Sequence, residues 1–298
     1  MRNLLTAVAL LLILLSAACS KATPATSGSQ GPPPEGAGSE ESAEIEYEDF
    51  DPTNFDHPTD INNIWLSLKP GTYWAYEGTA VEDGGTLSRR IEYAITDLTK
   101  EIGGVQTVVA WIVDYNNHQV IEKEVAFYAQ DNEGNVWYLG EHPEEYEEGE
   151  FVDAPTWIHG IGGSVAGIMM KADPQRGTPS YSEGWAPAVE FTDRAQVSEM
   201  GLQVCAFLDC YEDSLEIAEY NPDEPGIFQL KYYAVGLGEV RVGWKGPDPS
   251  QESLELVEYT QLSPVALEQV RAAALELEQH AYEISKDVYA QTLPMQVP

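Results

Sequence analysis

The segment YAQDNEGNVWYLGE (residues 128–141) gathers carboxylate and amide side chains of the kind that bind calcium. An EF-hand loop places such ligands at alternate positions around a glycine, and here Gly134 comes two residues too early. Asp131 and Asn132 are also residue types that bond their own backbone in tight turns. The segment is therefore predicted to be a turn between two strands.

A second acidic run, GEHPEEYEEGE (140–150), combines an imidazole with several carboxylates, which are donors for transition metals and Ca²⁺. The weak candidate metal ligands are His142, Glu144, Glu145, Glu148 and Asp131. The histidines are otherwise scattered, and such a run is usually a solvated loop. No glycine-rich loop follows a strand and opens a helix, so we predict neither a bound metal nor another cofactor.

The stretch GGSVA (162–166) nearly matches the nucleophile elbow of α/β-hydrolases, which would supply an activated serine. Ala166 stands where the second glycine belongs, and the required strand before and helix after are missing. We predict that the protein is not an enzyme, with an unrecognised hydrolase as an alternative.

Cys205 and Cys210 lie close together in QVCAFLDCYED. In an exported protein an isolated pair of this kind usually forms a disulfide, and four intervening residues suit a bridge across a tight turn between strands. A metal-binding or redox pair is the alternative. Redox pairs normally have two intervening residues, and no histidine lies nearby, so we favour the disulfide.

The first residues, MRNLLTAVALLLILLSAACS, have the pattern of a targeting segment: Arg2, a short apolar run, and small residues before Cys19. This pattern resembles the bacterial lipoprotein signal, in which the cysteine is lipidated after residues 1–18 are removed, although Ser16 replaces the preferred leucine. An ordinary secretory signal is the alternative. Acyl chains on Cys19 would add roughly 0.8 kcal/mol of membrane affinity per buried methylene. We expect a lipid-anchored protein on the extracytoplasmic side of the cell membrane or outer envelope.

Residues 19–60 are rich in Pro, Gly, Ser and Glu and contain almost nothing apolar before Ile45. Such a segment buries too little surface to offset the entropy of ordering it. It is predicted to be a disordered tether between the membrane and the folded part.

The chain is strongly acidic, with 50 Asp and Glu against 15 Lys and Arg and a net charge of −35. That charge excludes nucleic acid as a partner, because phosphates require a basic surface. It also disfavours a flat orientation on anionic lipid. Solubility explains the charge most simply, and binding of cations or of a basic partner remains open.

Short segments rich in β-branched and aromatic residues, bounded by Gly, Asn and Asp, predict an antiparallel β domain over 61–262. Its expected strands are 72–79, 89–98, 106–115, 119–130, 201–208, 214–220, 226–236, 238–244 and 253–260. Residues 140–200 read as a less regular break. The predicted fold class is mainly β, a curved antiparallel sheet or half-open barrel with a C-terminal amphipathic helix.

That helix is predicted over 263–292, with Ser263 as N-cap and Pro264 at the first helical position. Apolar residues recur at steps of three and four from Leu267 to Val288. The stripe resembles a coiled-coil seam but is wider and lacks flanking charge pairs. Packing on the sheet is therefore favoured over self-association.

A family resemblance extends over residues 60–260. It is carried by the phrases SLKPGTYWAYEGT, FYAQDNEGNVWYLGE, SVAGIMMKADPQRGTPSY and KYYAVGLGEVRV. Together they resemble a group of uncharacterised exported bacterial proteins, many of them lipoproteins. More loosely, they are similar to β-rich extracytoplasmic proteins with a curved half-barrel like that of lipid or lipoprotein carriers. The resemblance implies a curved sheet and brings no catalytic residues.

Three functions are consistent with these observations. The first is non-enzymatic binding of an apolar small molecule, a lipid or an envelope protein by a curved sheet with an aromatic lining. The chain has seven tryptophans, which would line such a cavity or simply fill the core. The second is an acidic cation-binding or structural envelope protein, and the third is the hydrolase.

Overall fold

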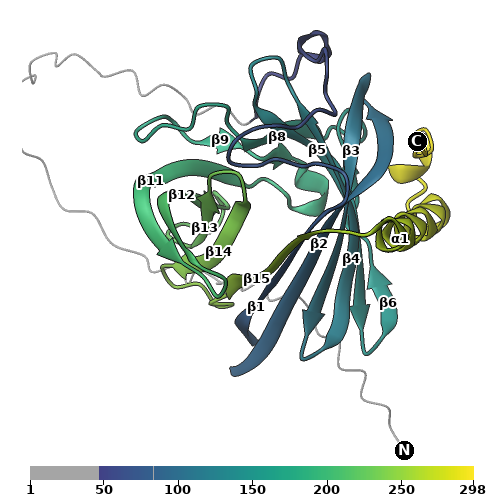
Figure 1. The fold of residues 1–298 in the computed structure, drawn as a ribbon. Coiled ribbons are helices and arrows are strands. Elements are labelled where there is room, and N and C mark those ends of the chain that lie inside the picture. Colours follow the sequence, from purple (N-terminus) through teal and green to yellow (C-terminus); the bar gives the residue numbers. More distant parts are fainter. Residues whose placement is uncertain (1–46, 83) are drawn as a thin grey trace, which may run out of the picture. The chain divides into compact units, whose positions relative to one another are not determined.

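The computed structural model describes residues 47–82 and 84–298, and a single curled β-sheet dominates this part of the chain (Figure 1). The predicted signal peptide, Cys19 and residues 19–46 of the predicted tether lie outside the described residues. In the described part, no helix is both long and apolar enough to cross a membrane.

The elements follow one another with short connections. The strands of the first half are β1 Thr72–Glu82, β2 Gly85–Ile102, β3 Val105–Asn116, β4 Gln119–Gln130, β5 Val136–Glu147, β6 Glu150–Asp153, β7 Trp157–Ile158 and β8 Val165–Met170. The later strands are β9 Tyr181–Ser182, β10 Gly184–Trp185, β11 Arg194–Cys205, β12 Cys210–Tyr220, β13 Phe228–Ala234, β14 Gly238–Lys245 and β15 Ser253–Gln261. The helices are η1 Pro52–Asn54, η2 Pro187–Val189, α1 Pro264–Ile284 and η3 Tyr289–Gln291.

Two antiparallel meanders, β1–β5 and β11–β15, form the sheet, in the order β10-β8-β5-β4-β3-β2-β1-β15-β14-β13-β12-β11-β9. They join where β1 pairs with β15, from Thr72 opposite Gln261 to Thr79 opposite Ser253. Strands make up 52% of the structure, and the sheet is nearly closed, with one seam and a single C-terminal helix. The predicted fold class is confirmed, and the barrel is closed further than half.

The seam is crossed by one short piece of chain. β9 pairs with β11 at one end of the sheet and β10 pairs with β8 at the other, and only Glu183 separates β9 from β10. The crossing lies tightly on Gly167 of β8, where a Cβ atom would come 2.3 Å from the carbonyl carbon of Glu183. Glycine is required there because the two backbones touch.

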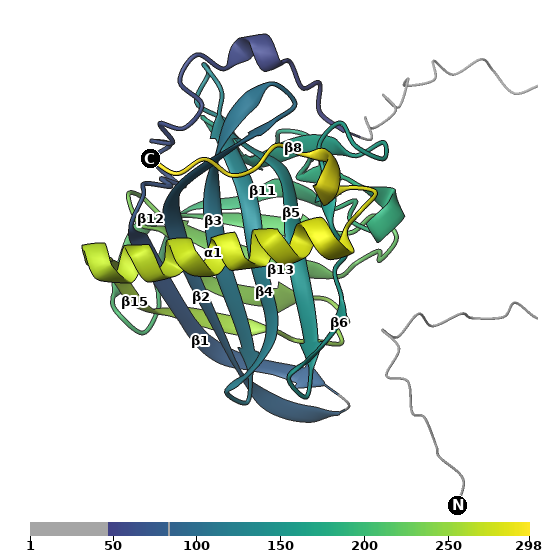
Figure 2. The ribbon, with the colours of Figure 1, turned by 90° about the vertical axis from the view of Figure 1, so that its right-hand side faces the viewer.

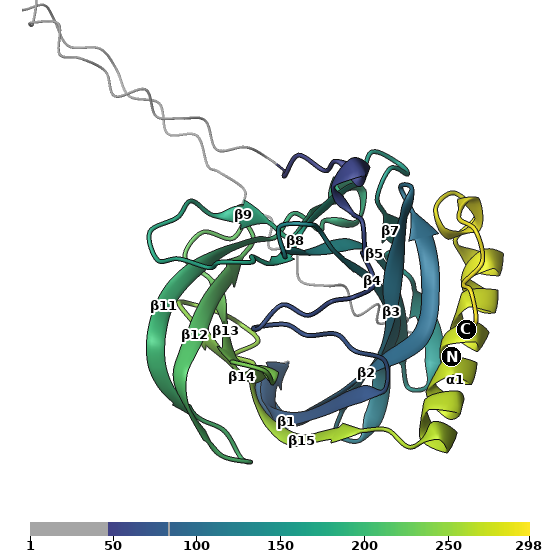
Figure 3. The same cartoon turned by 45° about the horizontal axis from the view of Figure 1, so that its top comes forward.

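The segment before β1 closes one end of the barrel (Figure 3). Backbone N–H groups of Asn62 and Asn63 donate to the Gln130 side chain at the end of β4, each at 2.9 Å. Farther along, the Ile64 carbonyl accepts from Gly236 N in the β13–β14 turn at 2.8 Å. These bonds join the two meanders across the barrel end.

The predicted tether extends too far toward the folded domain. Residues 47–60 were expected to belong to it, but Phe50 and Phe55 pack on Trp137, with ring centroids 5.3 and 6.2 Å away. Asn132 N also donates to the carbonyl of Asn54 at 2.8 Å. The two aromatic rings bury enough apolar surface to order a segment whose other residues are polar.

Residues 140–150 were predicted to be a solvated loop, and this was wrong. They continue β5 and turn into β6, with Val125 of β4 opposite His142. His142 is fully buried and Glu144 nearly so. Pairing with β4 outweighs the low β-propensity of the proline and glutamates in this run.

Helix α1 lies across the outside of β2–β5 (Figure 2). Ser263 Oγ accepts from Ala266 N at 3.2 Å and Pro264 occupies the first turn, as the sequence predicts. The buried face comprises Ala274, Leu277, Glu278 and Ala281, so the helix packs on the sheet. It ends at Ile284 instead of 292, because the tail folds back over Glu278.

Glu278 is a buried carboxylate that holds helix, sheet and tail together. Its Oε1 accepts from Lys100 Nζ of β2 at 2.8 Å and from Met295 N at 3.0 Å. Tyr289 of η3 donates to the same oxygen at 3.3 Å. Lys100 is fully buried; burial lowers its pKa, and the hydrogen bond with Glu278 opposes that shift.

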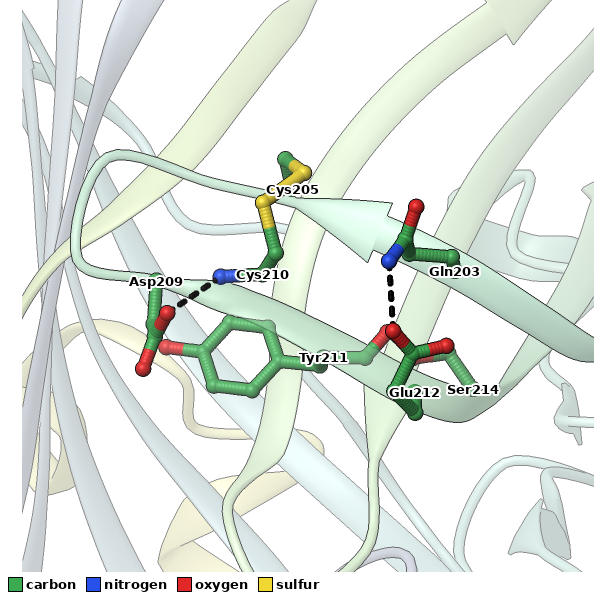
Figure 4. The surroundings of a disulfide bond; sticks show 7 residues. All are labelled: Gln203, Cys205, Asp209, Cys210, Tyr211, Glu212 and Ser214. Atoms are coloured by element: carbon green, nitrogen blue, oxygen red, sulfur yellow. Dashed lines mark hydrogen bonds between the residues drawn. A yellow bond between two sulfur atoms is a disulfide. The ribbon is translucent and has the colours of Figure 1, made fainter.

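Cys205 and Cys210 form a disulfide at the end of the β11–β12 hairpin (Figure 4). They are the last residue of β11 and the first of β12 and lie opposite each other in the register. The turn between them is further held by Cys210 N, which donates to Asp209 Oδ1 at 2.8 Å. Phe207 at the tip is 73% exposed.

Replacing Lys100 by methionine should lower the free energy of unfolding by about 3 kcal/mol, because the Glu278 carboxylate would stay buried without its cation. The double variant Lys100→Met, Glu278→Gln should recover most of this loss, since the amide oxygen still accepts from Met295 and Tyr289 without a charge. Urea unfolding monitored by circular dichroism measures both. Equal losses in the two variants would contradict the ion-pair role.

Candidate functional site

The barrel encloses a cavity of about 370 Å³ between the two meanders. Its walls are inward-facing side chains of β1–β5 and β12–β15, and Glu183 from the seam crossing also faces it. Leu66, from the segment that closes the barrel end, is part of the lining. Ligand pockets for small organic molecules start at about this volume.

Carboxylates dominate the charge of this cavity. Nine line it, and Lys231 is the one basic side chain among the described lining residues. The nine are Asp114, Glu122, Glu124, Glu141, Glu183, Asp193, Glu219, Glu239 and Glu252. Like charges held in a small volume of low dielectric repel one another and favour protonation.

Aromatic rings form most of the remaining wall. Tyr128 and Tyr138 stack with ring centroids 4.9 Å apart, and Trp74 packs edge-on to Tyr93 at 5.8 Å. Tyr76 and Tyr233 complete the set of lining tyrosines. The predicted apolar concavity is thus only part of the wall, because the rings alternate with acids.

Three carboxylates, Glu122, Glu124 and Glu141, form what we call the β4–β5 cluster. The hydroxyl of Tyr138 contacts both Glu124, at 3.2 Å, and Glu141. Since one hydroxyl donates one proton at a time, the second contact is a hydrogen bond only if a carboxyl group carries a proton. Trp157 Nε1 donates to Glu141 Oε1 at 2.9 Å.

The pKa values of this cluster are shifted in the corresponding direction. Burial and then the charge of Asp114 raise the pKa of Glu122 to about 8. Burial and the neighbouring Glu141 raise the pKa of Glu124 well above its usual value. Burial also raises the pKa of Glu141, against the hydrogen bonds that it accepts. The folded protein therefore holds protons here that solvent-exposed glutamates would release.

A second group, the seam cluster, consists of Glu183, Glu219 and Lys231. Lys231 Nζ pairs with Glu219 Oε2 at 2.7 Å. Burial lowers the pKa of Lys231, but the surrounding carboxylates outweigh it and raise this pKa. Oε1 of Glu219 and Oε1 of Glu183 are buried and have no hydrogen-bond partner in the described structure. Burial and the charge of Glu219 raise the pKa of Glu183 well above its usual value.

The remaining acids border these two clusters. Arg89 donates to Asp114 at 2.6 Å and to Glu252 at 2.7 Å. Burial nevertheless raises the pKa of Asp114 to about 6. Burial also raises the pKa of Asp193 to about 6 and that of Glu239 to about 7. The cavity as a whole is short of positive charge.

The metal-ligand candidates from the sequence do not come together. Asp131 accepts from Asn135 N at 2.8 Å and from Trp137 Nε1 at 2.8 Å, so it fixes the turn that the sequence predicts. His142 lies outside the barrel beneath α1, where Thr156 Oγ1 is 2.6 Å from Nδ1. In the described residues, no group of three His, Cys, Asp or Glu side chains is arranged to hold a metal ion.

The other two acidic candidates have separate structural surroundings. Glu144 Oε1 lies 2.7 Å from His280 Nδ1 of α1, and Tyr146 donates to Glu144 Oε2 at 2.6 Å. Glu145 is half-buried in β5, and Glu148 is exposed in the β5–β6 turn, with a φ of 52°. These residues fasten the helix or complete a turn.

The cavity acids were not among the residues singled out from the sequence. In QVIEKEVAF, Glu122 and Glu124 alternate with Ile121, Lys123 and Val125, the pattern of a half-exposed strand. The available signal was weak: both glutamates share a face with Tyr128, so one face of β4 carries acids and an aromatic together. Glu183 lies between strands too short to show periodicity.

No protein-family model matches the chain, and no curated protein matches it significantly. Among solved structures, the chain is similar to a candidate exported protein with a YmcC-like fold from Bacteroides fragilis NCTC 9343. The TM-score is 0.40 at 12% identity, over 67% of this chain and 100% of that one. It is also similar to a candidate lipoprotein from Parabacteroides distasonis ATCC 8503, with a TM-score of 0.34 at 12% identity, over 65% and 96% of the two chains. The family resemblance proposed from sequence phrases stays a prediction.

The raised pKa of Glu122 predicts that the protein becomes more stable as the pH falls from about 8 to about 6.5. In this window the unfolded chain has released this proton, because the usual pKa is 4.5, whereas the folded protein holds it with a pKa of about 8. The free energy of unfolding therefore decreases as the pH rises. Glu122→Gln should remove on the order of 1 kcal/mol of this change, measured by urea unfolding at both pH values.

The matched control is Glu258→Gln, which removes one charge at an exposed position of β15. It should keep the slope of the wild-type protein. If both variants changed the pH dependence equally, the effect would come from net charge and not from the cavity.

Proposed function

We propose that this protein is a lipid-anchored, extracytoplasmic binding protein that holds a small organic cation inside its barrel. The observation that carries the proposal is the composition of the cavity wall, nine carboxylates and one lysine around about 370 Å³. The apolar ligand expected from the sequence becomes a molecule with an apolar body and a positively charged amine.

The electrostatic argument starts from the raised carboxyl pKa values. Each is an ionisation that the folded protein disfavours, and a shift of one pKa unit corresponds to about 1.4 kcal/mol. A ligand cation among Glu122, Glu124 and Glu141 would favour their charged forms and recover this free energy on binding. An anionic ligand would add to the repulsion, and a fully apolar one would leave buried acids without partners.

The aromatic wall supports the same class of ligand. An ammonium group over the face of a tyrosine or tryptophan is stabilised by about 0.5–2 kcal/mol, more when water is excluded. Tyr93, Tyr128 and Tyr138 lie in the same wall as the β4–β5 cluster. Rings next to carboxylates suit an amine attached to a hydrocarbon or aromatic body.

Binding without catalysis remains our proposal, since no residues with a triad arrangement came from the sequence. Ser164 of the GGSVA stretch lies in a turn before β8, and His159 Nδ1 accepts from Ala166 N at 3.0 Å. That backbone bond occupies the imidazole nitrogen, so it is not available to orient the ring toward a serine.

The ligand class can be tested by isothermal titration of the full-length protein in detergent with three molecules of equal length: hexylamine, hexanol and hexanoate. We expect the amine to bind at least about tenfold more tightly than the other two, a difference of about 1.4 kcal/mol. Hexanol or hexanoate binding as tightly as the amine would overturn the proposal.

The anchor is tested separately through Cys19. Replacing Cys19 by serine should move the protein from the membrane fraction to the soluble fraction of its native host, because the acyl chains provide the attachment. Wild-type protein is the control for fractionation. A Cys19→Ser protein that stays membrane-bound would exclude lipid anchoring at this residue.

A further inference from the structure

We propose that the ligand is an organic dication, with one ammonium group at the β4–β5 cluster and the other at the seam cluster. This inference rests on the proposed function and specifies the ligand further. A bifunctional ligand follows from two groups of acids on different walls of one cavity, each with its own unmet requirement for positive charge.

The seam cluster contributes two buried oxygens that lack donors. Glu183 is 4% exposed and Glu219 is 8% exposed, and both line the cavity. Lys231 bonds Oε2 of Glu219 and leaves Oε1 of both glutamates without a hydrogen-bond partner. Buried polar atoms are nearly always hydrogen-bonded, so these two atoms indicate a place for a donor group from a ligand.

The β4–β5 cluster has the same shortage on another wall. Glu124 and Glu141 are bridged by Tyr138, which has a single proton to donate. Arg89, a nearby cation, is bound to Asp114 and Glu252. An ammonium group carries three donors, enough to bond two carboxylates and leave one for a third acceptor.

Aromatic side chains connect the two clusters. The Tyr138 ring, next to Glu124 and Glu141, lies 6.0 Å from the ring of Phe191. Phe191 lines the cavity close to Asp193 and contacts the seam, where its ring would meet a Cβ atom placed on Gly184. An apolar chain between the two ammonium groups would lie along these rings.

An ammonium group fits these clusters better than a metal ion. Ca²⁺ takes six to eight oxygens at about 2.3–2.6 Å, and the described residues contain no converging group of three acidic or imidazole ligands. Several of the oxygens are also occupied by Tyr138, Trp157 and Lys231. Hydrogen-bonding donors with a directional geometry match the remaining oxygens.

The test is isothermal titration of the full-length protein in detergent at about pH 7.5, with hexylamine, a series of α,ω-diaminoalkanes and CaCl₂. We expect the best diamine to bind at least about tenfold more tightly than hexylamine, with an optimum chain length. Diamine binding should also release more protons than hexylamine binding, measured in buffers of different ionisation enthalpy. This readout needs no variant.

The two ends are assigned with Glu124→Gln and Glu183→Gln. Each should weaken the best diamine at least about tenfold, toward the affinity of hexylamine, while hexylamine itself keeps its affinity within about threefold at the remaining cluster. Glutamine has the same shape and relieves repulsion, so neither variant should lose thermal stability. Glu258→Gln is the control and should change neither affinity.

The outcomes separate the two proposals. If hexylamine and every diamine bind equally, the dication is excluded and the cation-binding function stands. If no amine binds, both are excluded. If Ca²⁺ binds more tightly than any diamine, or if one substitution abolishes binding of hexylamine and diamines alike, the two-cluster arrangement is wrong.

Discussion

Pairing of the first and last strands is the constraint on which this protein depends. Hydrogen bonds between β1 and β15 join two meanders that are each continuous in sequence, and the curled sheet then encloses an interior. Side chains that would face solvent on an open sheet face one another across that interior. Because strands alternate their side chains, acids of β4 and β5 are brought into the same volume as acids of β12 and the seam. The shortage of positive charge inside the barrel is a consequence of closing it.

The outside of the sheet compensates for this unfavourable interior. Helix α1 covers the outer face, where Glu278 receives donors from Lys100, Met295 and Tyr289, and Arg271 Nε donates to Asp97 at 2.7 Å. These groups are paired, whereas the cavity acids are repelled by their neighbours. A protein that keeps such a cavity sacrifices stability for function, as binding sites often do. The division is spatial: stabilising contacts lie outside the barrel wall and the strained electrostatics inside it.

Much of the fold could be predicted from the sequence, because its signals are local. Alternation and turn residues placed β4 at 119–130, and Ser263 with Pro264 placed the start of α1. The spacing of Cys205 and Cys210 indicated the hairpin that joins β11 and β12. Long-range effects produced the differences. His142 became part of a strand because β4 pairs with it, and Phe50 became ordered because Trp137 lies beneath it. Glu122 and Glu124 show the same alternation whether their face is wet or enclosed, so only closure of the sheet reveals them as part of a site.

The irregular register of β11 has a consequence for how copies of this protein behave together. β11 is bonded to β9 only through Arg194 and Ala195, so most of its outer edge carries no ladder. Along its inner side the pairing with β12 shifts between Val197 and Glu199, between Met200 and Leu202, and between Leu202 and Val204. Such bulges twist a strand away from the flat geometry that a neighbouring chain needs for strand addition. At the high local density of a membrane surface, this irregularity would keep anchored molecules from polymerising edge to edge.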